Sequence, residues 1–310
     1  MIMQPQARSR LGIALGGGGA RGFLHAGVLA ALVEDSDSRL TPQYVTGTSI
    51  GSLVAALYAA GVSPRRVLEL GREITWLGDV VGKIATVKDA FLDVAGRVLP
   101  FWARRPGRAG FLSSNSLGKW VMSVSGCRSL DELKLPFAAV ATEVRRGERV
   151  LMCGAAHADT LRAAPRVTPS VPTRVLVPES LGLAVRASAA VPTVFEVIET
   201  QGLALVDGGF AEQVPVAACR ALGADIVIGV SLGIVEVFPQ IDLPYHALAN
   251  SFHIGMRSAI DAALALADIA IEPHGIEHTS VVDLGAASRL FEMGFAVMKE
   301  RLDDLRGLLS

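Results

Sequence analysis

Cysteine is scarce in this sequence. The 310 residues include three cysteines, Cys127, Cys153 and Cys219, and no two of them form a CxxC pair. An odd number of widely separated cysteines does not make a disulfide framework, and the missing CxxC pairs argue against a structural zinc site. The pattern fits a reducing compartment, so we expect a cytoplasmic protein without a metal site.

The sequence also lacks a long uninterrupted hydrophobic run. Apolar residues make up 51% of the chain, but Gly, Arg, His or Asp interrupts each run before the roughly 18 residues that a membrane-spanning helix needs. Segment 11–32 follows Arg8 and Arg10, as the core of a signal peptide would, yet it contains four consecutive glycines, Arg21 and His25. Such residues are foreign to a signal-peptide core. We therefore predict neither a transmembrane helix nor a signal peptide. Any membrane association is expected to be peripheral contact with the inner face of the membrane.

Neither sign of charge is in excess. The chain has 29 Lys and Arg residues against 30 Asp and Glu residues, which gives a formal net charge of −1. A balanced charge provides no overall attraction to nucleic acid or to an anionic membrane. No cluster of carboxylates has the spacing of a calcium-binding loop. We expect no nucleic-acid partner.

What the sequence does contain is a serine between two glycines, Gly47-Thr48-Ser49-Ile50-Gly51. An apolar segment precedes this pentapeptide and residues 53–57 after it are apolar, so the stretch is typical of a strand, a tight turn and a helix. The Gly-x-Ser-x-Gly pattern is typical of a nucleophile elbow, in which the serine backbone is strained and glycines remove β-carbons that would clash. The first amides of the helix bring partial positive charge near the hydroxyl. The pattern predicts Ser49 as a nucleophile.

A second glycine-rich turn, Gly16-Gly17-Gly18-Gly19-Ala20-Arg21-Gly22, lies between the apolar segments 11–15 and 23–32. Its Gly-x-Gly-x-x-Gly spacing matches a dinucleotide fingerprint, but that site needs an acidic residue near the end of the second strand, where Val45-Thr46-Gly47 stands. Alternatively, the bare amides form an oxyanion hole for attack by Ser49. Close packing between helix and strand is a third interpretation. We favour the oxyanion hole because it also explains Ser49.

The alternation of apolar strands and helices predicts an α/β fold with a mostly parallel, helix-covered sheet and sites at the carboxyl ends of the strands. We treat residues 1–310 as a single domain. The expected strands are 11–15, 43–46, 135–142, 148–152, 203–206, 226–231 and 281–283. The strands 135–142 and 148–152 are expected to form a hairpin. The expected helical segments are 23–32, 49–60, 64–75, 117–124, 186–192, 214–222, 246–270 and 288–309.

Three segments fall outside this pattern. Residues 1–10 are polar and are expected to fray. Within residues 76–112, aromatic side chains and arginines are interleaved between 97 and 108, which suggests a lid or interfacial segment for a lipid substrate; an ordinary surface connection is the alternative. Residues 155–180 contain four prolines and little periodicity, which predicts a loop insertion.

A carboxylate follows a later strand directly. Asp207-Gly208-Gly209 comes after the apolar segment 203–206. Charged residues at strand ends beside glycines are often functional, although an Asp-Gly turn is also a common connection. The sequence makes Asp207 a candidate site residue.

Taken in order, blocks 16–22, 47–51, 186–192 (Arg-Ala-Ser-Ala-Ala-Val-Pro) and 207–209 make the chain resemble the bacterial members of the patatin-like phospholipase family from about residue 11 to residue 271. The resemblance implies a three-layer α/β/α fold and hydrolysis of acyl esters of phospholipids, lysophospholipids or related lipids. It departs from the family pattern at Thr142-Glu143, where Thr-Asp is frequent, and at Gln213-Val214-Pro215, where Asn-Pro is frequent.

The resemblance also implies site residues, namely a Ser-Asp dyad in place of a triad. By motif, Ser49 is the nucleophile and Asp207 the base. The amides of Gly17, Gly18 and Gly19 form the oxyanion hole, and Arg21 falls at the family's arginine in the same motif. The remaining motif glycines are Gly16, Gly22, Gly47, Gly51, Gly208 and Gly209. The mechanism needs no metal or cofactor.

Other interpretations remain open at this point. A Ser-Asp-His triad would need a histidine after Asp207, and His246, His253, His274 and His278 are available. A catalytically silent, regulatory lipid-binding protein and a nucleotide-binding module are alternatives from other functional classes. For the enzyme, we expect a lipid or other acyl-ester substrate and peripheral membrane contact.

Overall fold

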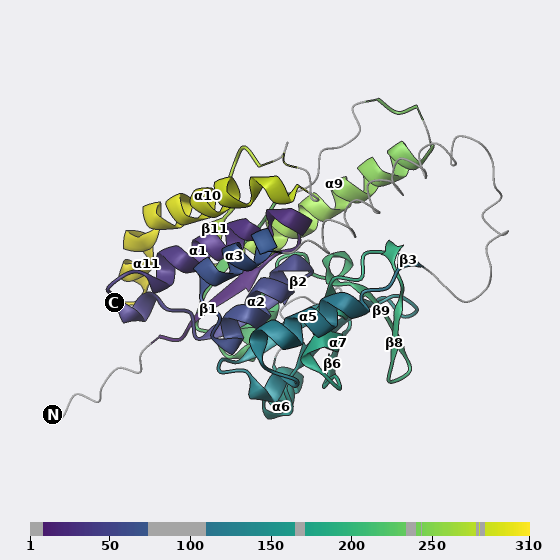
Figure 1. Cartoon of the computed structure of the whole chain (residues 1–310), viewed down its shortest axis with the longest axis horizontal. Helices are drawn as coiled ribbons and strands as arrows, with labels where there is room; N and C mark the ends of the chain where they lie inside the picture. Colours follow the sequence, from purple (N-terminus) through teal and green to yellow (C-terminus); the bar gives the residue numbers. More distant parts are fainter. Residues whose placement is uncertain are drawn as a thin grey trace.

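A computed structural model of the chain describes residues 9–73, 110–164, 171–233, 240–242, 244–276, 279 and 283–310. The C-terminus lies at the end of the body where the first described residues also lie (Figure 1). The described ranges leave out most of segment 1–10 and nearly all of segment 76–112, so the predictions of a frayed end and of a lid lie outside the described residues.

The strands form one nine-stranded sheet with the order β11-β10-β1-β2-β4-β5-β6, in which β9 also pairs with β4 and β8 pairs with β9. The pairs from β11 through β4 are parallel, and β5 and β9 run antiparallel to β4. A separate parallel pair joins β3 to β7. The strands are β1 (Leu11–Leu15), β2 (Tyr44–Thr48), β3 (Gly110–Leu112), β4 (Phe137–Glu143), β5 (Glu148–Cys153), β6 (Thr173–Leu176), β7 (Thr193–Phe195), β8 (Ile198–Thr200), β9 (Leu203–Asp207), β10 (Ile226–Val230) and β11 (Ile269–Ile271).

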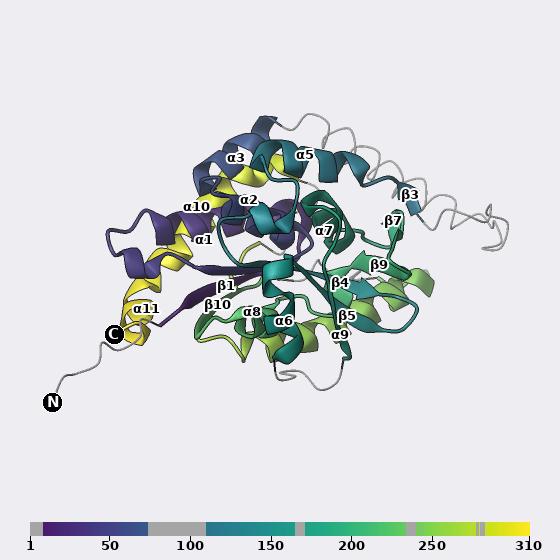
Figure 2. The same cartoon turned by 90° about the horizontal axis from the view of Figure 1, so that it is seen from below.

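Helices cover both faces of this sheet (Figure 2). One face carries α1 (Phe23–Val33), α2 (Ile50–Ala60), α3 (Pro64–Glu73), α5 (Asn115–Ser125), α7 (Leu181–Ser188) and α10 (Ala287–Glu300), and the other carries α6 (Ala155–Ala163), α8 (Val216–Leu222) and α9 (Pro244–Leu264). Covering on both faces explains why β1, β4, β9 and β10 are buried along their whole length, as parallel sheets require. The predicted three-layer α/β/α fold with a mostly parallel sheet is confirmed.

Helices α1 and α10 cross closely. A β-carbon on Gly27 would lie 1.9 Å from the carbonyl oxygen of Phe291, and one on Gly294 would lie 2.1 Å from that of Leu24. The two helices therefore approach through bare backbone, at a distance that only glycine permits.

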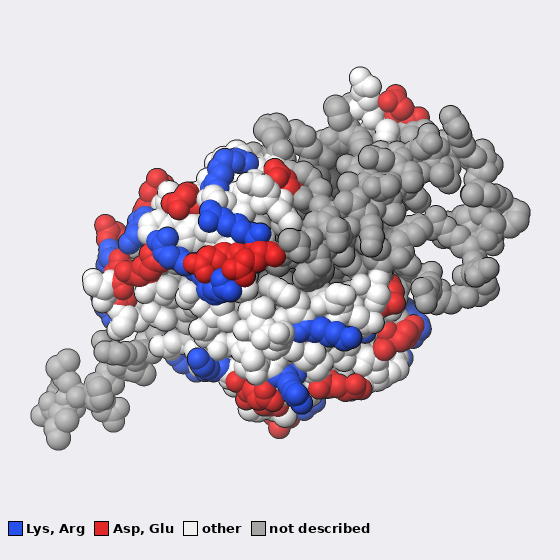
Figure 3. Space-filling model, in the orientation of Figure 1, with Lys and Arg blue, Asp and Glu red and all other residues white. Residues whose placement is uncertain are grey.

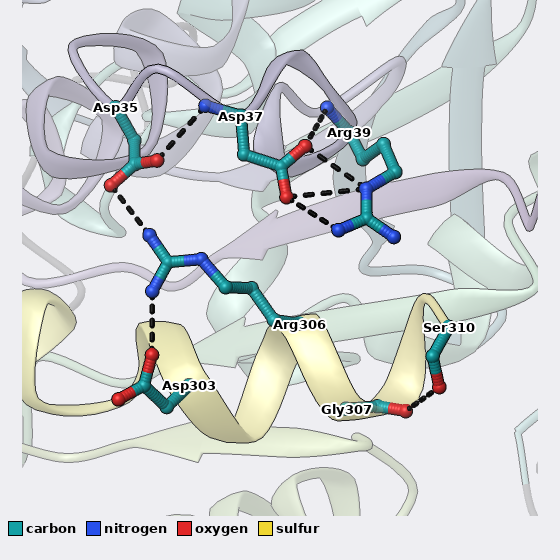
Figure 4. Close-up of polar contacts among 7 residues, drawn as sticks. All are labelled: Asp35, Asp37, Arg39, Asp303, Arg306, Gly307 and Ser310. Atoms are coloured by element: carbon teal, nitrogen blue, oxygen red, sulfur yellow. Dashed lines mark hydrogen bonds and ion pairs between the residues drawn. The ribbon is translucent and has the colours of Figure 1, made fainter.

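The C-terminal helix α11 (Leu302–Leu308) is held by charged side chains (Figure 4). Arg306 donates to Asp35, in the turn after α1, at 2.8 Å and to Asp303 at 2.6 Å. Beside this group, Arg39 pairs with Asp37 at 2.7 Å. On the face shown in Figure 3, positive and negative side chains are interleaved over α1, α3 and α10, and the ion pair between Arg65 and Glu34 is one example.

Segment 155–180 corrects the sequence-based expectation of a loop insertion. It contains helix α6, and strand β6 adds a parallel neighbour to β5 at the edge of the sheet. Two of its prolines flank the strand, since Pro172 precedes β6 and Pro178 follows it. Proline is compatible with the ends of an edge strand because no ladder hydrogen bond is lost there.

Further element ends differ from the predictions. Helix α9 ends at Leu264, and the last two residues of the predicted helix, 269 and 270, belong instead to β11. The closing helix is two helices that meet at Arg301. Helix α7 begins at Leu181 and ends at Ser188, so residues 189–192 are not helical. Asp283 caps a short 3-10 helix, and the rest of the strand predicted for 281–283 lies outside the described residues.

Candidate active site

Ser49 sits on a strained turn between β2 and α2. Its backbone has φ 55° and ψ −126°, a region that a residue with a β-carbon enters only at a cost of about 1–3 kcal/mol. A β-carbon on Gly47 would lie 2.4 Å from the backbone of Gly51, and one on Gly51 would lie 2.1 Å from the carbonyl oxygen of Leu15. Both glycines are therefore needed for the turn to pass this close to α2 and β1, and the half-buried serine projects where β2 ends.

Asp207 is the last residue of β9, and its side chain is inside the protein. The residue is 6% exposed. Oδ1 accepts a hydrogen bond from the Gly209 amide at 2.8 Å, whereas Oδ2 has no hydrogen-bond partner among the described residues. The backbone is held on both sides, because Asp207 N–H donates to the Ala190 carbonyl at 2.9 Å and its carbonyl accepts from Thr142 Oγ1 at 2.9 Å.

Burial raises the pKa of Asp207 to about 6. The Ser49 hydroxyl and the Gly209 amide act in the opposite direction, because both favour the carboxylate. The serine hydroxyl is therefore close enough to influence the carboxyl group, although the two are not within hydrogen-bonding geometry. Catalytic hydrogen bonds are often long in a free enzyme and tighten when substrate binds.

The sheet topology brings these two residues together. Along one edge of β4, β2 runs parallel and ends with Thr48 opposite Val140, while β9 runs antiparallel and ends with Asp207 opposite Ala141. The other edge of β4 is occupied by β5. The two strands thus approach the same edge from opposite directions and stop at adjacent positions of β4.

The glycine-rich turn packs against Ser49. A β-carbon on Gly17 would lie 3.2 Å from the Ser49 β-carbon. The amides of Gly16 and Gly17 are already used, since they donate to the carbonyls of Val230 at 2.9 Å and Gln213 at 3.2 Å. The amides of Gly18 and Gly19 have no acceptor among the described residues. Gly18 has φ 157° and Gly19 has φ 59°. Glycine adopts these backbone conformations more readily than other residues, so the glycines allow the turn that presents the two unpaired N–H groups.

Arg21 lies directly behind this turn. It is 1% exposed, and its guanidinium donates to the carbonyls of Leu232 at 3.2 Å and Thr279 at 2.9 Å. These two bonds tie the glycine-rich turn to the segments that follow β10 and β11. Arg21 therefore helps to hold the glycine-rich turn in place.

Two supports of the same turn are not signalled by the sequence. His25, on α1, is fully buried, and its Nε2–H donates to the Gly16 carbonyl at 2.8 Å. Burial lowers the pKa of this imidazole to about 4, so the ring is neutral at physiological pH. Gln213 donates from Nε2 to the Gly17 carbonyl at 3.2 Å and accepts from the Gly17 amide. Gln213 therefore links the turn to the segment after Asp207, at the position where the sequence departs from the family's Asn-Pro.

A buried ion pair supports that segment from the other side. Arg149 on β5 donates to Glu212 at 2.7 Å, and both side chains are 7% exposed. Glu212 also accepts from the Ala217 amide at the start of α8 at 3.2 Å, and its carbonyl accepts from Thr48 Oγ1 at 2.7 Å. The pair thus connects β5 to the backbone next to Ser49.

No described histidine is hydrogen-bonded to Asp207. His246 lies on α9, His274 is exposed after β11, and the His253 side chain and His278 are outside the described residues. In the described ranges, no three His, Cys, Asp or Glu side chains lie together as metal ligands would. None of the described helices combines the length and the apolar character that crossing a bilayer demands.

Comparison with known proteins shows which family the chain resembles in sequence. The family model for patatin-like phospholipases matches residues 13–220. An NTE family protein of Mycobacterium tuberculosis (strain ATCC 25618 / H37Rv) is 27% identical over 265 residues, covering 84% of this chain and 60% of the relative. Human patatin-like phospholipase domain-containing protein 6 is 27% identical over 225 residues, and lysophospholipase NTE1 of Pyricularia oryzae is 25% identical over 226 residues. The human match spans 72% of this chain and 13% of the relative. The Pyricularia oryzae match spans 73% of this chain and 12% of the relative.

Among solved structures, VipD from Legionella pneumophila aligns over 96% of this chain and 67% of its own, with a TM-score of 0.42 and 14% identity. The match of the family model extends from β1 through most of α8 and so includes the glycine-rich turn, Ser49 and Asp207. The chain therefore belongs to the patatin-like phospholipase family.

Proposed function

We propose that this protein is a serine hydrolase that cleaves acyl esters of phospholipids, lysophospholipids or related lipids. The observation that carries the proposal is the convergence of β2 and β9 on adjacent residues of β4, which brings Ser49 and Asp207 together at the carboxyl end of β2. The names of the relatives, a lysophospholipase and patatin-like phospholipase domain proteins, support a lipid ester as the substrate class.

In the proposed reaction, Ser49 Oγ attacks the ester carbonyl while the carboxylate of Asp207 accepts the hydroxyl proton. The oxygen of the former carbonyl becomes negatively charged, and the unpaired amides of Gly18 and Gly19 stabilise it. Collapse of the tetrahedral intermediate releases the alcohol, to which Asp207 returns the proton. Water then attacks the acyl ester of Ser49 by the same steps and releases the fatty acid. This version of the oxyanion hole omits the Gly17 amide, which donates to Gln213.

The raised pKa of Asp207 makes an aspartate adequate as the base. A solvated aspartate has a pKa of about 3.9, which is roughly 2.6 units below that of histidine and disfavours proton transfer by about 3.5 kcal/mol. With its pKa at about 6, Asp207 comes within about half a unit of histidine, or ~0.7 kcal/mol. Burial thus supplies most of the basicity that a triad would obtain from its histidine.

The test is intact-mass analysis after treatment with a fluorophosphonate ester, on the wild type and on Ser49→Ala. We expect one covalent adduct on the wild type and none on Ser49→Ala. Asp207→Asn should abolish esterase activity, whereas single substitutions of the four candidate histidines should leave it. Dependence on a histidine would favour the triad, and a folded wild type without adduct would favour a catalytically silent lipid-binding protein.

We also propose that the protein contacts lipid surfaces peripherally beside this site. Phe210 follows the Asp207-Gly208-Gly209 motif and is 47% exposed, and Val191, next to the Ala190 carbonyl that holds Asp207, is 40% exposed. Apolar side chains at the rim of a lipid site contact acyl chains. Phe210→Ser should lower activity on phosphatidylcholine vesicles several-fold more than activity on a soluble short-chain ester. Equal loss on both substrates would exclude this role.

A further inference from the structure

The Arg-Ala-Ser-Ala-Ala-Val-Pro block at 186–192 has no part in the chemistry proposed above, yet its serine touches the candidate nucleophile. Ser188 is the last residue of α7 and is fully buried. Its Oγ accepts a hydrogen bond from the Ser49 amide at 3.0 Å and donates one to the Val140 carbonyl at 2.5 Å. The Ser188 hydroxyl thus acts as an acceptor and as a donor at the same time, at the point where β2 ends.

The same turn also holds the candidate base. Two residues after Ser188, the Ala190 carbonyl accepts the amide of Asp207 at 2.9 Å. Ser49 and Asp207 come from strands that do not pair with each other, and they meet beside β4. The turn from Ser188 to Ala190 bridges them by hydrogen bonds to the backbone amide of each.

We propose that Ser188 is a positioning residue, whose hydroxyl holds Ser49 in its strained conformation and thereby fixes the Ser49 Oγ relative to the Asp207 carboxylate. This inference rests on the proposed function. A residue with positive φ keeps that conformation only when its surroundings determine it. The Ser188 hydroxyl is the described acceptor of the Ser49 amide, so its removal frees the turn to relax.

Loss of the hydroxyl should impair the chemical step more than substrate binding. In Ser188→Ala, the Ser49 amide and the Val140 carbonyl both lose a buried hydrogen-bond partner. We expect the Ser49 Oγ to move away from the Asp207 carboxylate as a result. A misplacement of about 1 Å costs on the order of 100-fold in rate. In the proposed reaction neither the Ser49 amide nor the Val140 carbonyl binds the substrate, so KM is expected to stay within about twofold while kcat falls.

Ser188→Thr and Ser114→Ala serve as comparison variants. Threonine keeps the hydroxyl but adds a methyl group to a fully packed position, which lowers stability. Ser114 is another buried serine, 2% exposed and before α5, whose Oγ has no hydrogen-bond partner among the described residues. The two variants separate loss of stability from loss of the hydrogen bonds.

The experiment measures the rate of fluorophosphonate labelling, kcat and KM on a soluble short-chain ester, and Tm for the wild type and the three variants. We expect Ser188→Ala to lower the labelling rate and kcat by about 10- to 100-fold. Ser188→Thr should recover both to within a few-fold of the wild type despite a lower Tm. Ser114→Ala should match the wild type in rate.

Two results would overturn the inference while leaving the proposed function intact: labelling of Ser188→Ala at the wild-type rate, or equal loss of kcat and Tm in Ser188→Ala and Ser188→Thr. The second would mean that the position matters only for packing. A wild type that is folded but not labelled would overturn the proposed function, and the inference with it.

Discussion

At Asp207 the proposed activity and the stability of the fold oppose each other. The folded-state pKa of Asp207, about 6, lies above the ordinary value of 3.8, so the folded protein binds this proton more tightly than the unfolded chain does. The stability that comes from the protonated form is fully present below pH 3.8 and is lost as the pH rises to about 6. At neutral pH the buried charge costs about 3 kcal/mol.

Asp207→Asn removes this charge and should raise the free energy of unfolding near pH 8 by on the order of 1–3 kcal/mol, with no gain below about pH 4. Urea titrations at both pH values measure the difference. Asp159→Asn is the matched control, because the Asp159 side chain is 96% exposed; it should change stability little at either pH. A loss of stability in Asp207→Asn near pH 8 would contradict the argument.

The same carboxyl group predicts the pH dependence of the rate. In the proposed reaction only the carboxylate form of Asp207 accepts a proton from Ser49, so kcat/KM should rise tenfold per pH unit below about 6 and become flat above it. His25 does not contribute a step above about pH 5, because its pKa of about 4 keeps the ring neutral there. A profile of kcat/KM between about pH 5 and pH 8 on a soluble ester checks this. A profile that is already flat from about pH 5 would mean that Asp207 is solvated in the working enzyme.

The sequence points to candidate site residues but not to the residues that hold them. Ser49, Asp207 and the glycines are recognisable because their spacing along the chain is local. The contacts of Ser188, His25 and Gln213 join segments far apart in sequence, and nothing local distinguishes a buried serine or histidine that makes such a contact. The Gly17 amide illustrates the same limit, since its acceptor is the Gln213 carbonyl.

At the scale of elements, the crossing of α1 and α10 depends on two glycines. Gly27→Ala would place a methyl group 1.9 Å from the Phe291 carbonyl oxygen, so the helices must separate. We expect a loss of unfolding free energy of about 1–3 kcal/mol or more, measured by urea denaturation. Gly307→Ala, in α11, is the control because a β-carbon there meets nothing within 4 Å; it should be neutral or stabilise by up to about 1 kcal/mol. Equal effects of the two would exclude a tight crossing.

Elements with strong periodicity are predicted correctly, and short or interrupted ones are not. The strands at β1, β2, β4 and β10 are recognisable from their apolar runs, and the β4–β5 hairpin from Arg145-Arg146-Gly147. Strand β6 has four residues among prolines, so its β structure depends on pairing with β5 and not on its own composition. For the same reason, the antiparallel placement of β9 against β4 cannot be read from the sequence.

At the scale of the whole molecule, the buried pair of Arg149 and Glu212 connects β5 to the segment behind the site. Removing one partner of a buried pair leaves an uncompensated charge, so Arg149→Met should lower the free energy of unfolding by about 3–5 kcal/mol. Adding Glu212→Gln removes the stranded charge but keeps an acceptor for the Ala217 amide, and should restore part of the loss. Urea denaturation of the single and double variants measures this, and equal stabilities would mean that the pair has no charge coupling.

The order of the strands has a consequence for synthesis of the protein. Strand β1 lies between β2 and β10, with Leu11 paired to Ile226, so a ribosome-bound chain keeps one side of its first strand open until residue 226 has emerged. Asp207 on β9 emerges well after Ser49 on the turn that follows β2. An unfinished chain therefore carries the serine without the carboxylate, and the proposed dyad is assembled only after β9 has left the ribosome.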